Sequence, residues 1–424
     1  MTILFLPDRY PKTKLASRHP EVASNLQKAS TSMMENGQKT VAWVGVARAD
    51  AESAVVFLPH GSPAGAPERE AFARDLMKAI VRFAREHARA GEGGDNESTT
   101  QTALLAELAM DFRDFGLYST REKIRGRRDG KPDWARTVKS GAAFPASNGA
   151  PVYFDIATSR YSSFATNVVA RIQAAVISEI NELHGWWVGH YFGAREVPRA
   201  APDTVWPRKI WPRLLRLARR ELFQSRAVNL VRMLLDYLEG SMETGDGRVV
   251  CGVSDFSTMW ETMLRDTLDG VEAHWNSYLP GPVYMNAWGH GDEAGRMELD
   301  IVVRKGDRIV ILDAKYYRAD SSTFVPGVQD ISKQIIYQRA VESTGRVAKD
   351  RITNAFIFPA ETTCRNPYKA IRFFLPDGSP ASGFPPVECQ FVSVPEVVTA
   401  YASRGKLADQ SWLPALYSIP AIAS

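Results

Sequence analysis

The sequence has few cysteines, no long apolar run and no P-loop, and each absence excludes a class of protein. Only three of its 424 residues are cysteines, Cys251, Cys364 and Cys389. Their small, odd number and wide spacing do not support a disulfide framework, and the lack of a CxxC pair or Cys/His cluster does not support a zinc site. No run approaches the roughly 18 apolar residues of a membrane span, and the apolar start is too short for a signal peptide. We therefore expect a cytoplasmic protein without a membrane segment.

A phosphate-binding loop of the form GxxxxGK[ST] is also missing, so this chain is not expected to be a P-loop NTPase. What the sequence does contain is the composition of an ordinary globular protein, with 45% hydrophobic and 24% charged residues. The net charge of +4 permits an acidic partner such as nucleic acid but does not require one.

The order of sequence patterns predicts an α/β protein with two parts. Strand-like and helical segments are mixed through the first 90 residues, and residues 90–101 are rich in Gly, Ser and acids, as in a loop. Helical patterns cover residues 159–184 and 212–240, and a polar boundary follows. We expect residues 1–245 to form a mixed α/β, partly helical N-terminal region that engages a partner, and residues 246–424 to form a second α/β domain.

The stretch ELDIVVRKGDRIVILDAKYY, residues 298–317, predicts two antiparallel strands joined by a turn at Gly306. Side chains alternate between faces along a strand, so Asp313 and Lys315 share one face of the second strand. Glu298 and Asp300 share one face of the first strand for the same reason. Asp300, Asp313 and Lys315 would then lie close together at the rim of an apolar sheet. They could be directly opposite across the two strands, or a bulge or offset between the strands could bring them together.

Such a group of residues suits phosphodiester hydrolysis. Carboxylate oxygens are ligands for Mg²⁺, which polarises a phosphate and acidifies bound water. A lysine beside them can stabilise the negative charge that develops during the reaction. The alternative is an exposed strand end in which Asp313 and Lys315 form an ion pair of no catalytic importance.

The neighbouring helices carry two further candidates. Glu261 lies in a helical segment just before the strand pair and could supply a third carboxylate; otherwise it is a solvated helix residue. Gln334 lies in the helical segment after the strand pair and could orient the lysine, the water or a phosphate; otherwise it is a surface residue. His274 and His290 have no partner at metal-ligand spacing, and we interpret both as structural.

A basic stretch at residues 121–139 contains two glycines and too few apolar residues for a core helix. It predicts a loop or hairpin in which Arg125, Arg127 and Arg128 contact either DNA phosphates or a partner protein, unless the stretch is only a solvated loop. A second basic stretch, residues 208–226, has the apolar spacing of a packed helix, so its arginines are expected on a polar face.

The series Glu261, Asp300, Asp313-Ala314-Lys315 and KQIIYQ resembles the PD-(D/E)XK nuclease superfamily. The segments LDAKYY and IRGRRDGKPDWARTVKS resemble the corresponding segments of McrC proteins, and particularly of the LlaJI restriction endonuclease family. The resemblance covers roughly residues 115–345. One departure is Leu299, where the motif has proline, and this leaves Glu298 as a rival to Asp300.

The resemblance implies a mixed sheet flanked by helices, the PD-(D/E)XK core. It implies that Asp300, Asp313 and the backbone carbonyl of Ala314 bind Mg²⁺, or Mn²⁺ in its place, with Glu261 as a further candidate ligand. Lys315 would support the attacking water, and Gln334 would belong to the following helix.

The implied function is that of the endonuclease subunit of a McrBC/LlaJI-type restriction system that defends against phage. Its partners would be double-stranded DNA and a separate McrB-like AAA+ NTPase, with a cytosine methyltransferase encoded nearby as a further associate. Two alternatives stay open: a self-sufficient PD-(D/E)XK nuclease of repair or recombination, and a non-catalytic adaptor that regulates an NTPase.

Overall fold

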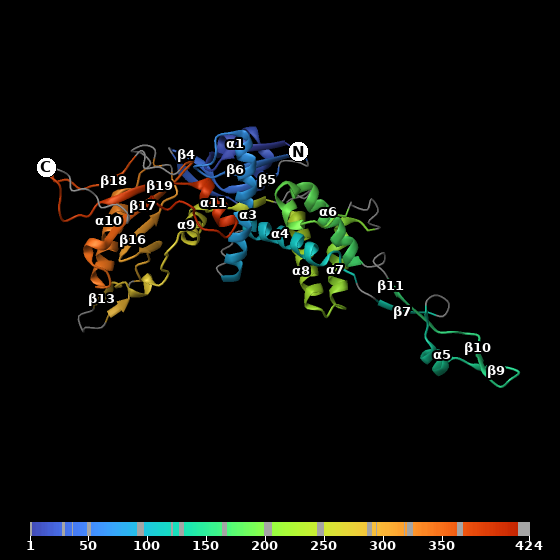
Figure 1. Ribbon diagram of the computed structural model, residues 1–424. Helices are drawn as coiled ribbons and strands as arrows, with labels where there is room; N and C mark the ends of the chain where they lie inside the picture. Colours follow the sequence, from blue (N-terminus) through green and yellow to red (C-terminus); the bar gives the residue numbers. More distant parts are fainter. Residues whose placement is uncertain are drawn as a thin grey trace. The chain divides into compact units, whose positions relative to one another are not determined.

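The computed structural model shown in Figure 1 describes most of the chain. The described residues are 2–27, 30–35, 37–48, 52–90, 97–119, 122–126, 131–162, 168–198, 206–243, 250–285, 291–293, 295–317, 319, 325–362 and 368–413. The chain divides into two compact units, one made of Met1–Ala103 with Arg248–Ser424 and the other of Leu104–Gly247. The expected division at residue 245 differs from this grouping, because the first hundred residues pack with the C-terminal part of the chain.

The N-terminal part of the first unit is built on a four-stranded sheet that includes a strand from much later in the sequence. The strand order is β1 (Thr2–Pro7), β6 (Ser53–Leu58), β5 (Val44–Arg48) and β12 (Val250–Val253). β12 pairs antiparallel with β5, so residues 250–253 form backbone hydrogen bonds with a sheet that is otherwise built from residues 2–58. This pairing is the physical reason why the first hundred residues belong with the C-terminal part of the chain.

Smaller elements complete this part of the unit. They are a three-stranded sheet of β2 (Tyr10–Pro11), β4 (Gln38–Ala42) and β3 (Thr31–Glu35), and the helices α1 (Lys12–Arg18), α2 (Pro20–Leu26) and α3 (Ala66–Ala90). Trp43 and Phe57 lie in the core between the sheet and the two short helices, with their rings edge to face.

The second sheet of the unit is five-stranded and mixed. Its order is β15 (Ile301–Lys305), β16 (Arg308–Ala314), β17 (Ile352–Ala360), β19 (Val387–Ser393) and β18 (Ala370–Ile371). β16, β17 and β19 are parallel, and the two edge strands are antiparallel to them. The helices of this part are α9 (Phe256–Thr267), α10 (Val328–Ser343) and α11 (Val394–Ala402). The predicted α/β class is confirmed.

β16 is apolar because it is an interior strand of this sheet, between β15 and β17. Ile309 and Ile311 pack against Tyr337 and Val341 of α10, which covers one face. α9 contacts β16 as well, and Val310 and Leu312 are as completely buried as their neighbours. Strands buried on both faces read as continuous apolar runs, which explains the RIVIL segment. A short hairpin, β13 (Val283–Met285) with β14 (Gly291–Glu293), precedes β15.

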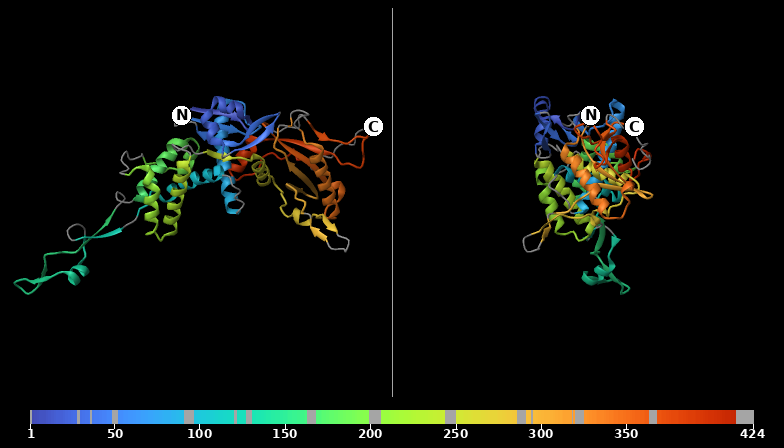
Figure 2. Two further views of the ribbon diagram at one scale, coloured as in Figure 1. Left: turned by 180° about the vertical axis from the view of Figure 1, so that it is seen from behind. Right: turned by 90° about the vertical axis from the view of Figure 1, so that its left-hand side faces the viewer.

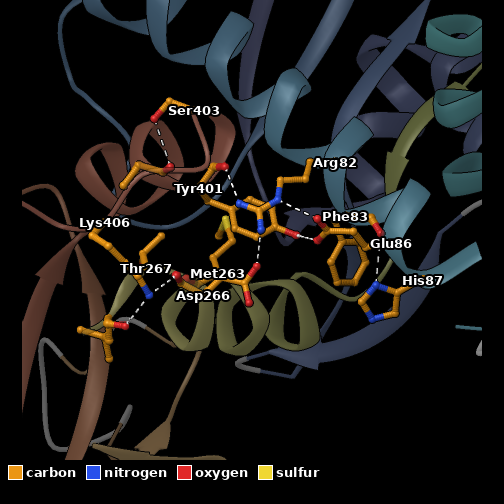
Figure 3. Close-up of polar contacts among 12 residues, drawn as sticks. Arg82, Phe83, Glu86, His87, Met263, Asp266, Thr267, Tyr401, Ser403 and Lys406 are labelled. Atoms are coloured by element: carbon orange, nitrogen blue, oxygen red, sulfur yellow. Dashed lines mark hydrogen bonds and ion pairs between the residues drawn. The ribbon is translucent and has the colours of Figure 1, made fainter. Parts of the chain in front are cut away.

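Arg82 of α3 joins the N-terminal part of the unit to the helices of the second sheet (Figure 3). Its guanidinium donates hydrogen bonds to Glu86 at 2.9 Å and to the Tyr401 carbonyl at 2.7 Å, and it forms an ion pair with Asp266 of α9. The same group lies over the Tyr401 ring, 3.9 Å from its centroid. One side chain therefore links α3, α9 and α11.

The second unit combines helices with two small sheets, as Figure 2 shows. Its helices are the greater part of α4 (Glu97–Phe115), α5 (Trp134–Ser140), α6 (Val168–Val188), α7 (Trp211–Arg219) and α8 (Ser225–Glu243). Its strands are β7 (Glu122–Gly126), β11 (Thr158–Ser162) and β8 (Lys131–Pro132) in one sheet, and β9 (Ala143–Pro145) with β10 (Pro151–Tyr153) in another.

Two helical predictions in this unit had the wrong bounds. The helix expected over residues 159–184 begins only at Val168, because residues 158–162 pair with β7 as the strand β11. The helix expected over residues 212–240 is two helices, α7 and α8, which pack against each other and are separated by residues 220–224. None of the described helices combines the length and apolar character needed to cross a bilayer.

Candidate active site

Asp313 and Lys315 lie where β16 ends. Asp313 is the penultimate residue of the strand and is only 3% exposed, so it lies inside the sheet rather than at an open rim. Lys315 follows the strand, and its backbone N–H donates to the Ile357 carbonyl of β17 at 2.9 Å. Its ammonium nitrogen is 2.9 Å from Oδ2 of Asp313. The predicted common face of these two residues is therefore realised.

Asp300 lies opposite Asp313. The antiparallel pair β15–β16 places Ile301 against Leu312, and continuing this register by one residue brings Asp300 to Asp313 without a bulge. The backbone N–H of Ala314 donates to Oδ2 of Asp300 at 3.1 Å. Glu298 is exposed on the approach to the strand, so of the two rival acids it is Asp300 that meets β16. The strand itself begins at Ile301, slightly later than expected.

The charge of Asp300 is strongly disfavoured in this position. Burial, followed by the negative charges of Asp313 and Glu261, raises the pKa of Asp300 to about 7, and the Ala314 N–H opposes the rise only in part. Lys315 behaves in the opposite way. Burial lowers its pKa, but its hydrogen bonds and ion pairs with Asp313 and Asp330 outweigh burial and hold the pKa above its usual value.

Glu261 of α9 lies close enough to act on Asp300 but is engaged elsewhere. Its carboxylate accepts a hydrogen bond from Arg265, one helical turn further on, and Arg265 also donates to the Asp300 carbonyl at 3.1 Å. Among the described residues, no three His, Cys, Asp or Glu side chains are grouped tightly enough to hold one metal ion. A role for Glu261 as a third ligand remains a prediction.

The donor set of Asp300 and Asp313 nevertheless fits a divalent cation. Two opposed carboxylates, one of them with its pKa raised by burial and repulsion, offer oxygen ligands and a charge excess that a hard cation would relieve. The backbone carbonyl of Ala314, between Asp313 and Lys315, stays a predicted third ligand.

Gln334 lies on α10 and is 1% exposed, which rules out the alternative of a surface residue. Its backbone carbonyl accepts from Nδ2 of Asn354 at 3.2 Å, and the same nitrogen donates to Gln338 at 2.7 Å. Within the described part of the chain its own side-chain amide makes no hydrogen bond, so no contact with Lys315 is seen. Its proposed role in orienting the lysine or a phosphate stays a prediction.

Two contacts of the site region were missed from the sequence. Asp330, in the first turn of α10, pairs with Lys315 at 2.9 Å. Tyr316, the residue after the lysine, donates from its hydroxyl to Asp8 at 3.1 Å and accepts from the backbone N–H of His60 at 3.0 Å. Only Asp330 had a sequence signal, since it is an acid at the start of the next predicted helix.

The predicted basic contacts fall largely outside the described residues. Arg127 and Arg128 are not described, and of Arg125 only the backbone is, in β7 opposite Ser159. In the second basic stretch three of the arginines form ion pairs within their unit. These pairs are Arg208 with Glu179, Arg216 with Glu239 and Arg226 with Asp111. The ring of His274 packs edge to face on Tyr278, and His290 lies outside the described residues.

The fold and the site define an α/β protein with two opposed carboxylates and a lysine at the end of a mixed sheet. Comparison with known proteins then gives the family. The model of the LlaJI restriction endonuclease family matches residues 84–374, and the chain belongs to this family. The resemblance to the LlaJI family that the sequence motifs indicated is confirmed.

Other relatives are more distant. Component YdjA of the type II restriction enzyme BsuMI from Bacillus subtilis (strain 168) is 30% identical over 125 residues. That match covers 26% of this chain and 26% of the relative, so the chain spans about a quarter of the relative's length.

Two solved structures are also similar. One is a half-complex of Thermococcus gammatolerans McrB AAA+ hexamers with bound McrC; it has 14% identity, a TM-score of 0.38 and coverage of 95% of this chain and 99% of that one. The other is the McrBC complex of the same organism, with 13% identity, a TM-score of 0.28 and coverage of 63% and 89%. At these TM-scores the structural likeness supports no argument.

Proposed function

We propose that this chain is the Mg²⁺-dependent DNA endonuclease subunit of a McrBC/LlaJI-type restriction system. The observation that carries the proposal is that Asp300 lies opposite Asp313, which pairs with Lys315, at the end of the interior strand β16. Membership of a restriction endonuclease family supports the same chemistry. An adaptor that only regulates an NTPase would not need two opposed carboxylates beside a lysine.

In this mechanism Asp300 and Asp313 would hold Mg²⁺, with Mn²⁺ as a substitute. When bound, the ion supplies charge neutralisation at the scissile phosphate and lowers the pKa of its water. Lys315 would donate hydrogen bonds to the attacking water or to a phosphate oxygen, because its ammonium already lies beside Asp313. Burial of Asp313 would exclude bulk water from one side of the reacting group.

The first test is cleavage of double-stranded plasmid DNA with Mg²⁺ or with EDTA, in the presence of the NTPase encoded by the neighbouring gene and its nucleotide. Asp313→Asn and Lys315→Ala should each abolish cleavage, whereas Glu298→Gln, which changes an exposed acid two residues from Asp300, should retain it. Each variant is checked for folding by circular dichroism. Cleavage at the normal rate by folded Asp313→Asn would rule out the nuclease assignment.

We further propose that cleavage depends on a separate AAA+ NTPase. Support comes from the missing P-loop, from the McrC-like sequence motifs and from the basic stretch of residues 121–139, which suits contact with a partner. The proposed target is double-stranded DNA, and a nearby cytosine methyltransferase gene would agree with a restriction system. A self-sufficient nuclease would cleave without any partner, so the same assay with and without the neighbouring NTPase separates the two candidates.

The basic stretch is tested by changing Arg125, Arg127 and Arg128 together to alanine. If the stretch contacts the NTPase, stimulation of nucleotide hydrolysis and partner-dependent cleavage should fall, while DNA binding by the isolated chain stays unchanged. If it contacts phosphates, DNA affinity should fall for all sequences, and its salt dependence should flatten by up to about 0.9 log unit per log unit of salt for each lost contact. No change in either measurement would assign these residues to a solvated loop.

A further inference from the structure

The ammonium of Lys315 forms ion pairs with two carboxylates, those of Asp313 and Asp330. Its ammonium nitrogen is 2.9 Å from Oδ2 of Asp313 and 2.9 Å from Oδ1 of Asp330. A lysine ammonium has three hydrogens, so it can donate to both acids at once. Asp313 belongs to β16 and Asp330 to α10, so the lysine joins the strand of the site to the helix that covers its sheet.

The two acids differ in their surroundings. The side chain of Asp313 is 5% exposed, and that of Asp330 is 38% exposed. Asp330 also lies in the first turn of α10, where the positive end of the helix dipole favours a carboxylate. The covering helix therefore holds a negative charge beside Lys315 without the burial that Asp313 undergoes.

We propose that Asp330 is a positioning residue that keeps the Lys315 ammonium in the site when Asp313 turns its oxygens to a divalent cation. The inference rests on the proposed function, and it assigns a role to a residue that lies outside the proposed ligand set. An Asp313 oxygen that binds a cation is a weaker partner for an ammonium, and the cation repels the ammonium. Asp330 then retains the lysine, which otherwise has a long flexible chain that can reach solvent.

The same geometry links Asp330 to cation affinity. Without Asp330, Asp313 is the one carboxylate partner left to the ammonium among the described residues, so lysine and cation compete for it. With Asp330 present the lysine can give up Asp313 and keep an ion pair. The effect of Asp330 on cation affinity should therefore depend on the presence of Lys315, which would not be so for an ion pair remote from the cation.

The decisive experiment is a double-mutant cycle on binding of Ca²⁺ to the full chain, measured by isothermal titration calorimetry without DNA. Asp330→Asn should weaken Ca²⁺ binding about tenfold in the wild-type background and only about twofold when Lys315 is already alanine, a coupling typical of residues in direct contact. Asp330→Glu, which keeps the charge, should recover most of the affinity. Asp350→Asn, which changes an exposed aspartate that pairs with Arg351, is the matched control and should leave the affinity unchanged.

Equal losses in both backgrounds would overturn the proposal, because Asp330 would then act on the cation by its charge alone. Absence of Ca²⁺ binding to the wild-type chain would overturn it as well. Cleavage gives the second readout: Asp330→Asn should lower kcat at saturating Mg²⁺ and leave the KM for DNA unchanged, and a rise in KM alone would contradict the assigned role. If the wild-type chain binds Ca²⁺ with the expected coupling yet cleaves no DNA with or without its partner, the proposed function fails and the positioning role stands.

Discussion

Replacing Asp300 by asparagine should stabilise the metal-free protein at pH 8. The pKa of Asp300 is raised from its ordinary 3.8 to about 7 by burial and by the charges of Asp313 and Glu261. At about 1.4 kcal/mol for each tenfold change in an ionisation constant, holding this group ionised costs the fold at most about 4 kcal/mol. Relaxation of the side chains and solvent around the carboxylate recovers part of this cost, so we expect a gain of roughly 2 kcal/mol.

The pH dependence of this gain has a definite sign. A folded-state pKa above the unfolded value means that the folded protein binds the extra proton between about pH 4 and pH 7. The wild-type protein therefore loses stability as the pH rises through this window, and the penalty is complete above it. The amide of asparagine has no charge to lose and can still accept from the Ala314 N–H. The advantage of Asp300→Asn should thus grow from pH 5 to pH 8.

The measurement is urea denaturation of wild type, Asp300→Asn and Glu298→Gln at pH 5 and pH 8 in the presence of EDTA. Glu298 is an exposed acid close by in the sequence, so its replacement serves as the control and should change stability by less than about 0.5 kcal/mol. Saturating Mg²⁺ should reverse the order by stabilising wild type and not the asparagine variant. A wild-type protein as stable as Asp300→Asn at pH 8 without metal would refute the reasoning.

Three further measurements test the packing of the first unit. Arg82→Ala should destabilise the protein by about 2 kcal/mol, because Asp266 and Glu86 lose a half-buried partner, whereas Arg74→Ala, which breaks an exposed pair with Glu70, should cost under about 0.5 kcal/mol. Tyr316→Phe should cost about 1–3 kcal/mol in urea denaturation, since it removes the buried hydroxyl between Asp8 and the His60 N–H, and an unchanged midpoint would contradict this. Cys251, whose pKa burial raises to about 12, should resist iodoacetamide at pH 8 until the protein is unfolded, as peptide mass spectrometry would show.

The hairpin of the site could be predicted from the sequence because its turn leaves little choice. Gly306 has a φ of 65°, and with Asp307 it forms a two-residue turn that places Lys305 opposite Arg308. Counting back along both strands from that pair places Asp300 opposite Asp313. The alternation of side chains then fixes Lys315 on the same face as Asp313, so the core of the site follows from local rules.

Contacts made over long sequence separations could not be predicted in this way. Periodicity shows which face of α10 is buried, but it does not show that the helix returns Asp330 to Lys315. The grouping of residues 1–103 with residues 248–424 in one unit also depends on contacts between residues far apart in the sequence. β12 completes the sheet of residues 2–58 from nearly two hundred residues away, and no local pattern specifies that pairing.

Residues 8 and 9, in the N-terminal part of the chain, support the peptide that carries the lysine. Asp8 accepts the hydroxyl hydrogen of Tyr316 across 308 residues of sequence, and Arg9 donates to the Tyr316 carbonyl at 3.0 Å. Burial raises the pKa of Asp8 to about 6, while hydrogen bonds from Trp43 and Arg9 and the charge of Arg9 oppose the rise. Because Tyr316 directly follows Lys315, a displacement of residues 8–9 would move the backbone at the site. The N-terminal sheet is thus part of the structure that positions the lysine.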